Sequence, residues 1–334
     1  MLAALTETLR LGHELTNGDV VTACESLFDE NVELSARADF LRALHAKGET
    51  AAEVAAFVDV LLTRSRRTPL GPGLLDVCGT GGDRAGVFNV STAAMFVATA
   101  CGARVVKHGN RGITSKCGGA DVLEALGVRI DLPPEIALEA AGCCFLFAPL
   151  FHPAFKNIAP VRKLLAEEGS ATIFNLLGPL LNPARPEFQL AGVFDGKLLP
   201  LYAEAFKLLG RKCGWAVHGS GGLDEVSTLG PTDIHALEDG AIRQFVIRPE
   251  DLDVAPARIE DLRGGEAQQN AQSLEAILQG KDTGPRHDMV VLNAACALVV
   301  SERAHDLPAA MTLAATALAN GSAHDVLQRL RNVG

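Results

Sequence analysis

The sequence predicts an α/β protein in which a small N-terminal helical domain precedes a large domain with a mainly parallel sheet flanked by helices. Its 334 residues are about twice the ~150 typical of one domain, so one large α/β domain or a large and a small one is expected. The first ~65 residues carry apolar stripes at helical spacing between polar breaks. Further on, short apolar segments alternate with helical patterns, as in parallel sheets with helices on both faces.

Four helices are expected in the N-terminal part. The first carries an apolar stripe made of Leu2, Leu5, Leu9 and Leu11. A polar break at residues 17–19 ends this stripe, and Asp19 is expected to cap the second helix. Two more stripes cover residues 36–46 and 51–63. Since this part contains no pattern of catalytic residues, its expected role is packing or an oligomer interface.

The large domain is expected to begin after Pro69. The candidate strands are residues 74–77, 105–106, 129–130, 144–147, 189–193 and 213–217. The helices expected among and after them are residues 92–100, 120–126, 200–209, 268–278, 288–300, 308–320 and 324–332. Residues 234–247 have the pattern of a hairpin that turns at 238–240.

Composition and charge exclude several classes of protein. Apolar residues make up 48% and charged residues 21%, which is typical of a globular chain and not of a disordered one. The net charge of −10 disfavours binding to nucleic acid or to an anionic membrane. No uncharged apolar stretch approaches the ~18 residues needed to span a bilayer. The 8 cysteines include no CxxC pair, so a reduced cytoplasmic protein without zinc is expected.

A glycine-rich segment at residues 76–83 is the first candidate site. A predicted strand leads into three glycines, and a helix is expected to open near Ser91. Exposed backbone N–H groups in such a loop, together with a helix N-terminus, form an anion site. Asn89, Ser91 and Thr92 add polar groups there. The alternative is a tight turn followed by an ordinary N-cap, and neither standard nucleotide-binding fingerprint is present.

A second candidate segment, residues 107–121, follows the next predicted strand. It contains the cations Lys107, Arg111 and Lys116 among several glycines. Loops at the carboxyl ends of parallel strands are where α/β sheets bind ligands, and these cations suit phosphate oxygens. A solvated basic loop would explain the charges but not the glycines. The segment therefore favours a second phosphate site.

Two shorter motifs complete the set. The segment from His152 to Lys163 contains Arg162, which suits a carboxylate, although a basic surface helix is an equal explanation. Asp224 and Glu225 follow a predicted strand, and two adjacent carboxylates suit Mg²⁺, which commonly binds through carboxylates and substrate phosphates. Two solvated acids in a turn are the alternative. Together the four segments indicate a polyphosphate substrate with Mg²⁺.

These residues resemble the anthranilate phosphoribosyltransferase family, and the resemblance covers nearly the whole chain. The motifs that carry it lie at residues 79–83, 89–92, 107–111, 120–127, 145–163, 172–180 and 223–225, with further segments at 264–271 and 284–294. The family transfers ribose 5-phosphate from phosphoribosyl diphosphate (PRPP) to the amino group of anthranilate and releases diphosphate. The resemblance implies a helical domain over 1–68, joined by a segment around 153–180, and an α/β domain over 69–334.

The resemblance also implies which residues bind the substrates and Mg²⁺. PRPP is expected to contact Gly79, Gly82, Asp83, Val87, Asn89, Val90, Ser91, Thr92, Lys107, His108, Gly109, Asn110, Arg111, Gly112, Ile113, Thr114, Ser115 and Gly119. Anthranilate is expected to contact Gly79, His108, Asn110, His152 and Arg162. The implied Mg²⁺ ligands are Ser91, Asp224 and Glu225. No residue is assigned as a general acid or base, so positioning and electrostatics are expected to carry the catalysis.

Several positions depart from the family pattern. Cys117 and Gly119 stand where serines are usual, and Val87 stands where a threonine is common. Residues 164–171 are longer than usual and end in Ala171, where an arginine is frequent. The stretch between Gly127 and Phe145 is correspondingly shorter. These two changes in length are expected near the acceptor site, so they leave the choice of the acceptor more open than the choice of PRPP.

Three alternatives follow. A phosphoribosyltransferase for another aromatic amine is consistent with the altered acceptor segments. A pyrimidine-nucleoside phosphorylase is disfavoured by Asn110 and by the pair Asp224 and Glu225. A non-catalytic nucleic-acid-binding homologue is disfavoured by the net charge and by the same acidic pair. By resemblance a homodimer is expected, and the leucine stripe of the first helix is a candidate interface.

Overall fold

The computed structural model describes residues 1–82, 85–112 and 116–333. Contacts within the chain divide it into two compact units. The helical unit comprises Met1–Arg67 and Pro149–Pro183, and the sheet unit comprises Thr68–Ala148 and Ala184–Gly334. No helix among the described residues is long and apolar enough to cross a membrane.

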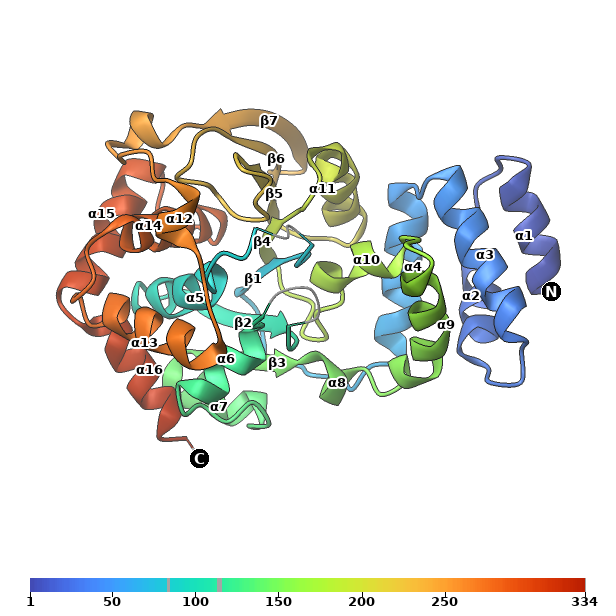
Figure 1. Cartoon of the computed structure of the whole chain (residues 1–334), viewed down its shortest axis with the longest axis horizontal. Coiled ribbons are helices and arrows are strands. Elements are labelled where there is room, and N and C mark those ends of the chain that lie inside the picture. The colour runs from blue at the N-terminus through green and yellow to red at the C-terminus, as the bar shows by residue number, and fades with distance from the viewer. Residues whose placement is uncertain (83–84, 113–115, 334) are drawn as a thin grey trace. The chain divides into compact units, whose positions relative to one another are not determined.

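The helical unit is built from helices alone (Figure 1), which pack around an apolar core. Its helices are α1 (Leu2–Arg10), α2 (Asn17–Phe28), α3 (Leu34–Lys47), α4 (Ala51–Thr63), α9 (Phe155–Glu167) and α10 (Phe174–Leu177), followed by a 3₁₀ turn, η1 (Gly178–Leu180). Phe40 and Phe57 are fully buried at its centre. The four helices predicted for the N-terminal part are therefore present, and a later segment of the chain completes the unit.

Two expectations for this unit are wrong in detail. Thr16, and not Asp19, is the N-cap of α2: the Thr16 hydroxyl accepts a hydrogen bond from the backbone N–H of Asp19 at 3.2 Å. The Asp19 carboxylate accepts one in return from the backbone N–H of Thr16, which completes a capping box. Two leucines of the predicted stripe, Leu2 and Leu9, are only 5% and 1% exposed and pack inside the unit, whereas Leu11 is 74% exposed. These two leucines are therefore not available for an interface.

The sheet unit contains one seven-stranded sheet in the order β3-β2-β1-β4-β5-β6-β7. Its strands are β1 (Leu74–Gly79), β2 (Arg104–Gly109), β3 (Cys143–Phe147), β4 (Phe188–Gly192), β5 (Cys213–Gly219), β6 (Thr232–Glu238) and β7 (Ala241–Ile247). The first five strands are parallel, and β6 and β7 are antiparallel. This arrangement confirms the predicted mainly parallel sheet.

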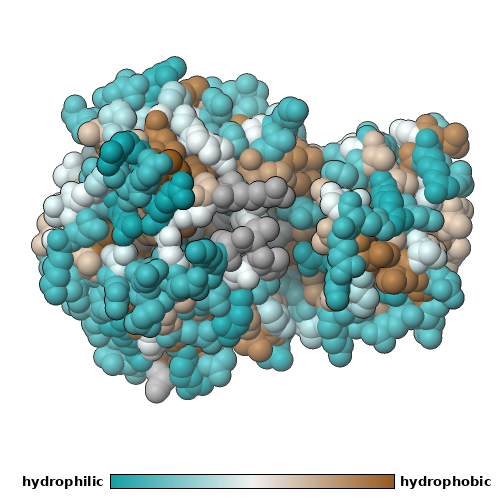
Figure 2. Space-filling model, in the orientation of Figure 1, coloured by the Kyte–Doolittle hydropathy of each residue, from teal (hydrophilic) through white to brown (hydrophobic). Residues whose placement is uncertain are grey.

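Helices cover the sheet between and after the strands (Figure 1). They are α5 (Val90–Ala100), α6 (Gly119–Ala125), α7 (Pro134–Ala141), α11 (Leu199–Leu208), α12 (Ile259–Leu262), α13 (Ala267–Leu278), α14 (Pro285–Val300), α15 (Leu307–Ala319) and α16 (Ser322–Arg331), with the 3₁₀ turns η2 (Gly196–Leu198) and η3 (Pro249–Leu252). Helix α8 (Ala148–Phe151) directly follows β3, and all but its first residue belong to the helical unit. Helices α5 and α7 lie on one face with α14 to α16 around them, and α11 lies on the other face (Figure 1). The face of this unit seen in Figure 2 is largely hydrophilic, because the apolar side chains are packed inside.

The predicted hairpin is confirmed, and its turn explains the sequence there. Asp239 and Gly240 both have positive φ, 49° and 75°, which suits the two-residue turn that joins twisted strands. Trp215 on β5 packs edge-on against Phe245 on β7, with ring centroids 5.1 Å apart. The Trp215 indole N–H donates to Glu238 at 2.8 Å, so the ring bonds to one strand of the hairpin and packs on the other.

One predicted strand is wrong. Residues 129–130 belong to the connection between α6 and α7. Val128 and Ile130 are buried, whereas the exposed Arg129 pairs with Asp131 at 3.0 Å. This alternation imitates a strand, but the segment pairs with none of the named strands.

The order of the strands fixes where a ligand can bind. Strand β1 lies between β2 and β4, and the chain proceeds outward from it in both directions. At such a reversal the loops leave in opposite directions and open a crevice beyond the carboxyl ends of the strands. Both glycine-rich segments follow the carboxyl ends of strands at this edge, β1 and β2.

Candidate functional site

Four of the five parallel strands end on a glycine, and these ends define the carboxyl edge of the sheet. The four are Gly79 on β1, Gly109 on β2, Gly192 on β4 and Gly219 on β5. Gly79 and Gly192 are direct partners in the register of β1 and β4. Glycine at these ends permits other parts of the chain, or a ligand, to approach the backbone closely.

Asp224 occupies the space above β1 and β4. A Cβ at Gly79 would lie 2.5 Å from Asp224 Oδ2, and a Cβ at Gly192 would overlap the main-chain oxygen of Asp224. The Asp224 carboxylate accepts a hydrogen bond from the backbone N–H of Gly81 at 2.6 Å. The structure therefore brings the acidic pair and the first glycine-rich loop together, although about 140 residues separate them in sequence.

Glu225, Ser91 and Lys107 form the next layer of contacts. The backbone N–H of Ser91, in the first turn of α5, donates to Glu225 Oε1 at 3.2 Å. The Lys107 ammonium donates to Ser91 Oγ at 3.1 Å and also to the carbonyl oxygen of Val77. Lys107 is only 4% exposed. The buried ammonium of Lys107 and the carboxylate of Glu225 thus both bond to Ser91 at the start of α5, and Asp224 precedes Glu225 in the chain.

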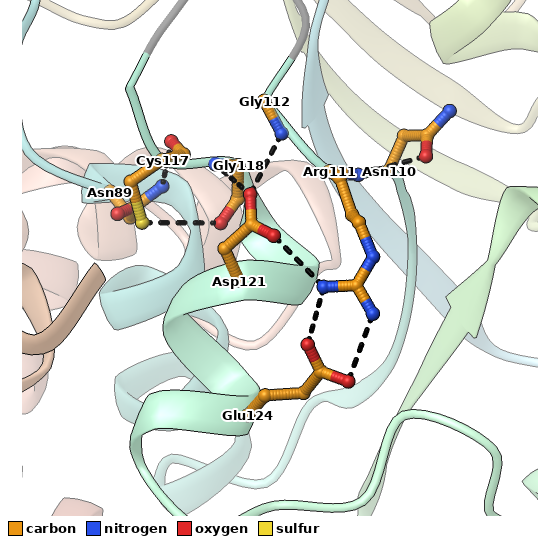
Figure 3. Close-up of polar contacts among 8 residues, drawn as sticks. All are labelled: Asn89, Asn110, Arg111, Gly112, Cys117, Gly118, Asp121 and Glu124. Atoms are coloured by element: carbon orange, nitrogen blue, oxygen red, sulfur yellow. Dashed lines mark hydrogen bonds and ion pairs between the residues drawn. The ribbon is translucent and has the colours of Figure 1, made fainter. Parts of the chain in front are cut away.

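The second glycine-rich loop is held by Asp121 of α6 (Figure 3). Its Oδ2 accepts hydrogen bonds from the backbone N–H groups of Gly112 at 2.8 Å and Gly118 at 2.9 Å, and its Oδ1 pairs with Arg111 at 3.0 Å. These donors hold the pKa of Asp121 below its ordinary value, against the opposing effect of burial. Gly118 must be glycine here, because a Cβ would overlap the backbone of Arg111 and Gly112.

The remaining predicted residues of the second loop lie near these hydrogen bonds of Asp121. Asn110 is exposed, and its backbone carbonyl accepts a hydrogen bond from Ala120 at 3.2 Å. His108 is 4% exposed, and its backbone N–H donates to the buried carboxylate of Asp76 at 3.1 Å. Gly119 opens α6 and has room for a Cβ, 3.4 Å from the ring of Phe145.

The predicted residues of the first loop are placed as follows. Gly82 packs on Phe194, whose ring would lie 3.0 Å from a Cβ at that position. Val87 forms an isolated β-bridge with Arg263. Asn89 is the N-cap residue of α5, and Val90 and Thr92 are each 1% exposed. Asp83, Ile113, Thr114 and Ser115 lie outside the described residues.

Two of the residues predicted to contact anthranilate belong to the helical unit. Arg162 on α9 is half-buried, and its guanidinium lies over the ring of Phe174 at 5.7 Å. No carboxylate in the described part of this unit pairs with it, and burial lowers the pKa of Arg162. His152 is buried, which lowers its pKa to about 4. Its ring is therefore neutral at pH 7, and Nε2 donates to the carbonyl of Leu181 at 2.9 Å.

Sequence reasoning missed three residues that shape the site. Gly192 was assigned only to a strand, and Asp121 only to the end of a motif. Asn270, on α13, donates to Asn89 at 3.0 Å. A glycine ending a buried strand and an aspartate three residues after Gly118 were the available signals for the first two. Asn270 had no local signal beyond its place in a segment that resembles the family.

The donor set at this edge fits Mg²⁺ held together with a substrate. Asp224, Glu225 and the Ser91 hydroxyl supply hard oxygen donors, which Mg²⁺ prefers. Among the described residues, no three His, Cys, Asp or Glu side chains are grouped as a metal cage. Mg²⁺ usually keeps waters and binds through one or two carboxylates plus phosphate oxygens, so a partial set is what a substrate-bridged ion requires.

Cys117 is not arranged as a nucleophile. Burial raises the pKa of its thiol to about 11, so the thiolate is scarce at neutral pH. The side chain lies beside the second loop, where its Sγ contacts the carbonyl of Gly118 at 3.6 Å (Figure 3). The carboxyl edge of the sheet therefore offers charged side chains and backbone N–H donors, and not a reactive thiolate.

Comparisons with known proteins agree across the whole chain. Residues 3–65 match a family model described as the helical bundle domain of a glycosyl transferase family, and residues 71–324 match its a/b domain. An anthranilate phosphoribosyltransferase of Desulfatibacillum aliphaticivorans is 42% identical over 99% of this chain and 98% of its own length. One from Methylobacterium nodulans is 45% identical over 96% of this chain and 94% of its own.

Solved structures of similar proteins give the same result. The anthranilate phosphoribosyltransferase (TrpD) of Thermus thermophilus has a TM-score of 0.91 and 38% identity, with 98% of each chain covered. The Saccharomyces cerevisiae protein, in complex with PRPP and Mg, has a TM-score of 0.88 and 26% identity, covering 99% of this chain and 97% of its own.

Proposed function

The chain belongs to the anthranilate phosphoribosyltransferase family, and we propose that it transfers the 5-phosphoribosyl group of PRPP to the amino group of anthranilate. The products are N-(5-phosphoribosyl)anthranilate and diphosphate, and the reaction is a step of tryptophan biosynthesis. The observation that carries the proposal is the placement of Asp224 and Glu225 over the glycine-lined ends of β1 and β4, bonded to the first glycine-rich loop.

PRPP binds along the carboxyl edge of the sheet unit in this proposal. The residues proposed to contact it are Gly79, Gly82, Asp83, Val87, Asn89, Val90, Ser91, Thr92, Lys107 to Ser115, and Gly119. Backbone N–H groups at the start of α5 and the ammonium of Lys107 bind its diphosphate. Gly119 has no side chain, so it contributes only its backbone.

Mg²⁺ is the proposed cofactor, held by Ser91, Asp224 and Glu225. When bound, it offsets negative charge on the diphosphate leaving group. The protein's own part is to hold the two carboxylates in place, through the N–H groups of Gly81 and Ser91. Lys107 adds a fixed positive charge beside Ser91, where leaving-group charge develops as the bond from C1 breaks.

Anthranilate recognition is assigned to Arg162, His152, Gly79, His108 and Asn110. Arg162 suits a carboxylate, since its half-buried guanidinium has no acidic partner in the described part of the helical unit. His152 is neutral at pH 7 and hydrogen-bonded to a backbone carbonyl, so it contributes a steric contact and no charge. No residue is proposed as a general base, and positioning of the amine carries this half of the reaction.

Domain division, assembly and location are part of the same proposal. Family membership supports a helical domain over 1–68, joined by residues around 153–180, and an α/β domain over 69–334. A homodimer is supported by apolar side chains exposed on the helical unit, Leu11 at 74%, Val21 at 42% and Leu34 at 38%. We place the protein in the cytoplasm and propose neither a nucleic-acid nor a membrane partner.

The decisive assay follows the loss of anthranilate fluorescence with PRPP and Mg²⁺. We expect a decay that requires both and that is lost in an Asp224→Asn/Glu225→Gln variant. Arg162→Ala should lower kcat/KM for anthranilate by about tenfold or more, the worth of a charge-assisted bond. A change below twofold would remove Arg162 from the acceptor site.

A second candidate acceptor is tested by the same experiment. Residues 164–171 depart from the family pattern and contain no arginine that could bind an acceptor. Ala171, which stands where an arginine is frequent, is exposed. If calorimetry detects PRPP binding but anthranilate fluorescence does not decay, the enzyme uses another aromatic amine. If PRPP does not bind at all, the proposed function is wrong.

A further inference from the structure

Two side-chain amides connect three segments that are distant in the sequence. Asn270, on α13, is 4% exposed, and its Nδ2 donates to Oδ1 of Asn89 at 3.0 Å. Asn89 Nδ2 in turn donates to the carbonyl of Cys117 at 3.1 Å (Figure 3). Asn270 Oδ1 accepts a hydrogen bond from the backbone N–H of Gly265 at 2.7 Å. The α13 region is thereby connected to both glycine-rich loops.

The direction of this chain of hydrogen bonds is fixed at both ends. The N–H of Gly265 can only donate, and the carbonyl of Cys117 can only accept. Both amides must therefore orient their oxygen toward Gly265 and their nitrogen toward Cys117. A flipped Asn89 would place two oxygens together at Cys117, which leaves a buried acceptor without a donor. The Asn270 amide therefore favours the same orientation of the Asn89 amide as the Cys117 carbonyl does.

Backbone hydrogen bonds also join the first loop to the α12–α13 connection, in addition to the bonds of the two amides. Phe88 donates to the carbonyl of Leu262 at 3.1 Å, and Gly264 donates to the carbonyl of Gly86 at 2.8 Å. Val87 completes the pairing as a bridge to Arg263. This backbone pairing holds the first loop on the α12–α13 connection. In the described part of the second loop, hydrogen bonds to this region run through Asn89 and Asn270, and α13 also packs against α6, the helix that follows this loop.

Asn270 also lies close to the Cys117 side chain. Burial raises the pKa of this thiol to about 11, and the Asn270 amide opposes the rise. Asn270 thus lies beside both the backbone partner of Asn89 and the side chain of the same cysteine.

We propose that Asn270 is a positioning residue for PRPP, which sets the spacing of the two glycine-rich loops through Asn89 without touching the substrate. The proposal rests on the function proposed above. It predicts that loss of the Asn270 amide weakens PRPP binding more than anthranilate binding, because most of the residues assigned to PRPP lie in the two loops, whereas Arg162 and His152, assigned to anthranilate, lie outside them.

The test compares Asn270→Ala and the nearly isosteric Asn270→Asp with the wild type in steady-state kinetics. Asn270→Asp still accepts from Gly265 but cannot donate to Asn89. We expect both variants to raise KM for PRPP by about tenfold, the worth of one or two buried hydrogen bonds, with KM for anthranilate within twofold. Gln272→Ala, at an exposed position of the same helix, is the control and should match the wild type.

A double variant separates positioning from a general structural role. If Asn270 acts through Asn89, then Asn89→Ala/Asn270→Ala has a PRPP KM close to that of Asn89→Ala alone. Effects that multiply would overturn the proposal, as would equal losses for both substrates or failure of both Asn270 variants to fold. A wild-type protein without activity refutes the proposed function instead, whereas an active wild type with unaltered Asn270 variants refutes only this inference.

Discussion

The two glycine-rich loops of the sheet unit have similar compositions but are held in different ways. In the first loop, Gly81 and Phe88 are held by distant parts of the chain: Asp224 accepts from Gly81, and Leu262 accepts from Phe88. In the second loop, Gly112 and Gly118 are held by Asp121, in the helix that directly follows. In the first loop, Gly79 and Gly82 make room for Asp224 and Phe194 of distant segments, whereas Gly118 makes room for the second loop's own backbone.

This difference separates stability from activity. The first loop is complete only when β1, β4 and the acidic pair have assembled, so substitutions there should affect both folding and catalysis. The second loop closes on its own helix, so substitutions there should change substrate binding and leave most of the stability intact. Three sets of variants test this contrast.

Gly192→Ala should have the largest effect. The new Cβ would overlap the main-chain oxygen of Asp224, and neither backbone can move without disturbing the pairing of β1 with β4. We expect the free energy of unfolding to fall by about 3 kcal/mol in urea titrations, with loss of activity. Gly18→Ala in α2 is the control, because its nearest neighbour would lie 3.8 Å away. Wild-type stability in Gly192→Ala would contradict the close approach.

Gly118→Ala should act mainly on substrate binding. Its Cβ would overlap the backbone at Arg111 and Gly112, displacing the loop without touching the sheet. We expect KM for PRPP to rise by about tenfold, the equivalent of ~1.4 kcal/mol, with a smaller loss of stability than in Gly192→Ala. Gly119→Ala, at the adjacent position with 3.4 Å of room, should show the smaller kinetic effect. The reverse order would show that the second loop is not held as described.

Asp121→Asn should have the smallest effect of the three. It keeps the size of the side chain but places an amide where one N–H group already points, so KM for PRPP should rise about threefold. Glu124→Gln removes an exposed ion pair to the same Arg111 without touching the loop backbone, and it should match the wild type. An equal effect of both variants would assign the role to the arginine.

The hydrogen bonds to the Asp121 carboxylate contribute stability that depends on pH in a defined direction. The pKa of Asp121 lies below its ordinary value of 3.8 in the folded protein. A lowered pKa contributes stability that is present above the unfolded value and is lost as the pH falls through the folded one. The effect of Asp121→Asn should therefore be equal at pH 6 and pH 8, when KM for PRPP is measured at both. A difference between them would mean that the carboxylate titrates within this range.

The sequence predicted local features of the fold well because they depend on neighbouring residues. The alternation of strands and helices, and the hairpin at Asp239 and Gly240, follow from periodicity and turn chemistry. Residues 129–130 imitated a strand because burial alternates there, and no pairing partner can be read from one sequence. The polar break at residues 17–19 favours Asp19 as the cap, whereas Thr16, three residues before Asp19, has the right offset for the capping box.

The candidate site was predictable in its parts and not in its assembly. The glycines, the cations and the acidic pair can be recognised in the sequence by residue type. Whether they lie close together in space depends on the order of the strands. Gly192 owes its importance to Asp224, and Asn270 owes its importance to Asn89, across separations that periodicity does not reach. Long-range register is therefore what the structure adds to the sequence.

The most direct test of the account is calorimetric titration of PRPP into the protein with and without Mg²⁺. The account predicts that the Asp224→Asn/Glu225→Gln variant binds PRPP at least about tenfold more weakly than the wild type when Mg²⁺ is present. Without Mg²⁺ the two proteins should bind it with similar, weak affinity. Equal affinities in the presence of Mg²⁺ would contradict the placement of the metal and the diphosphate over the ends of β1 and β4.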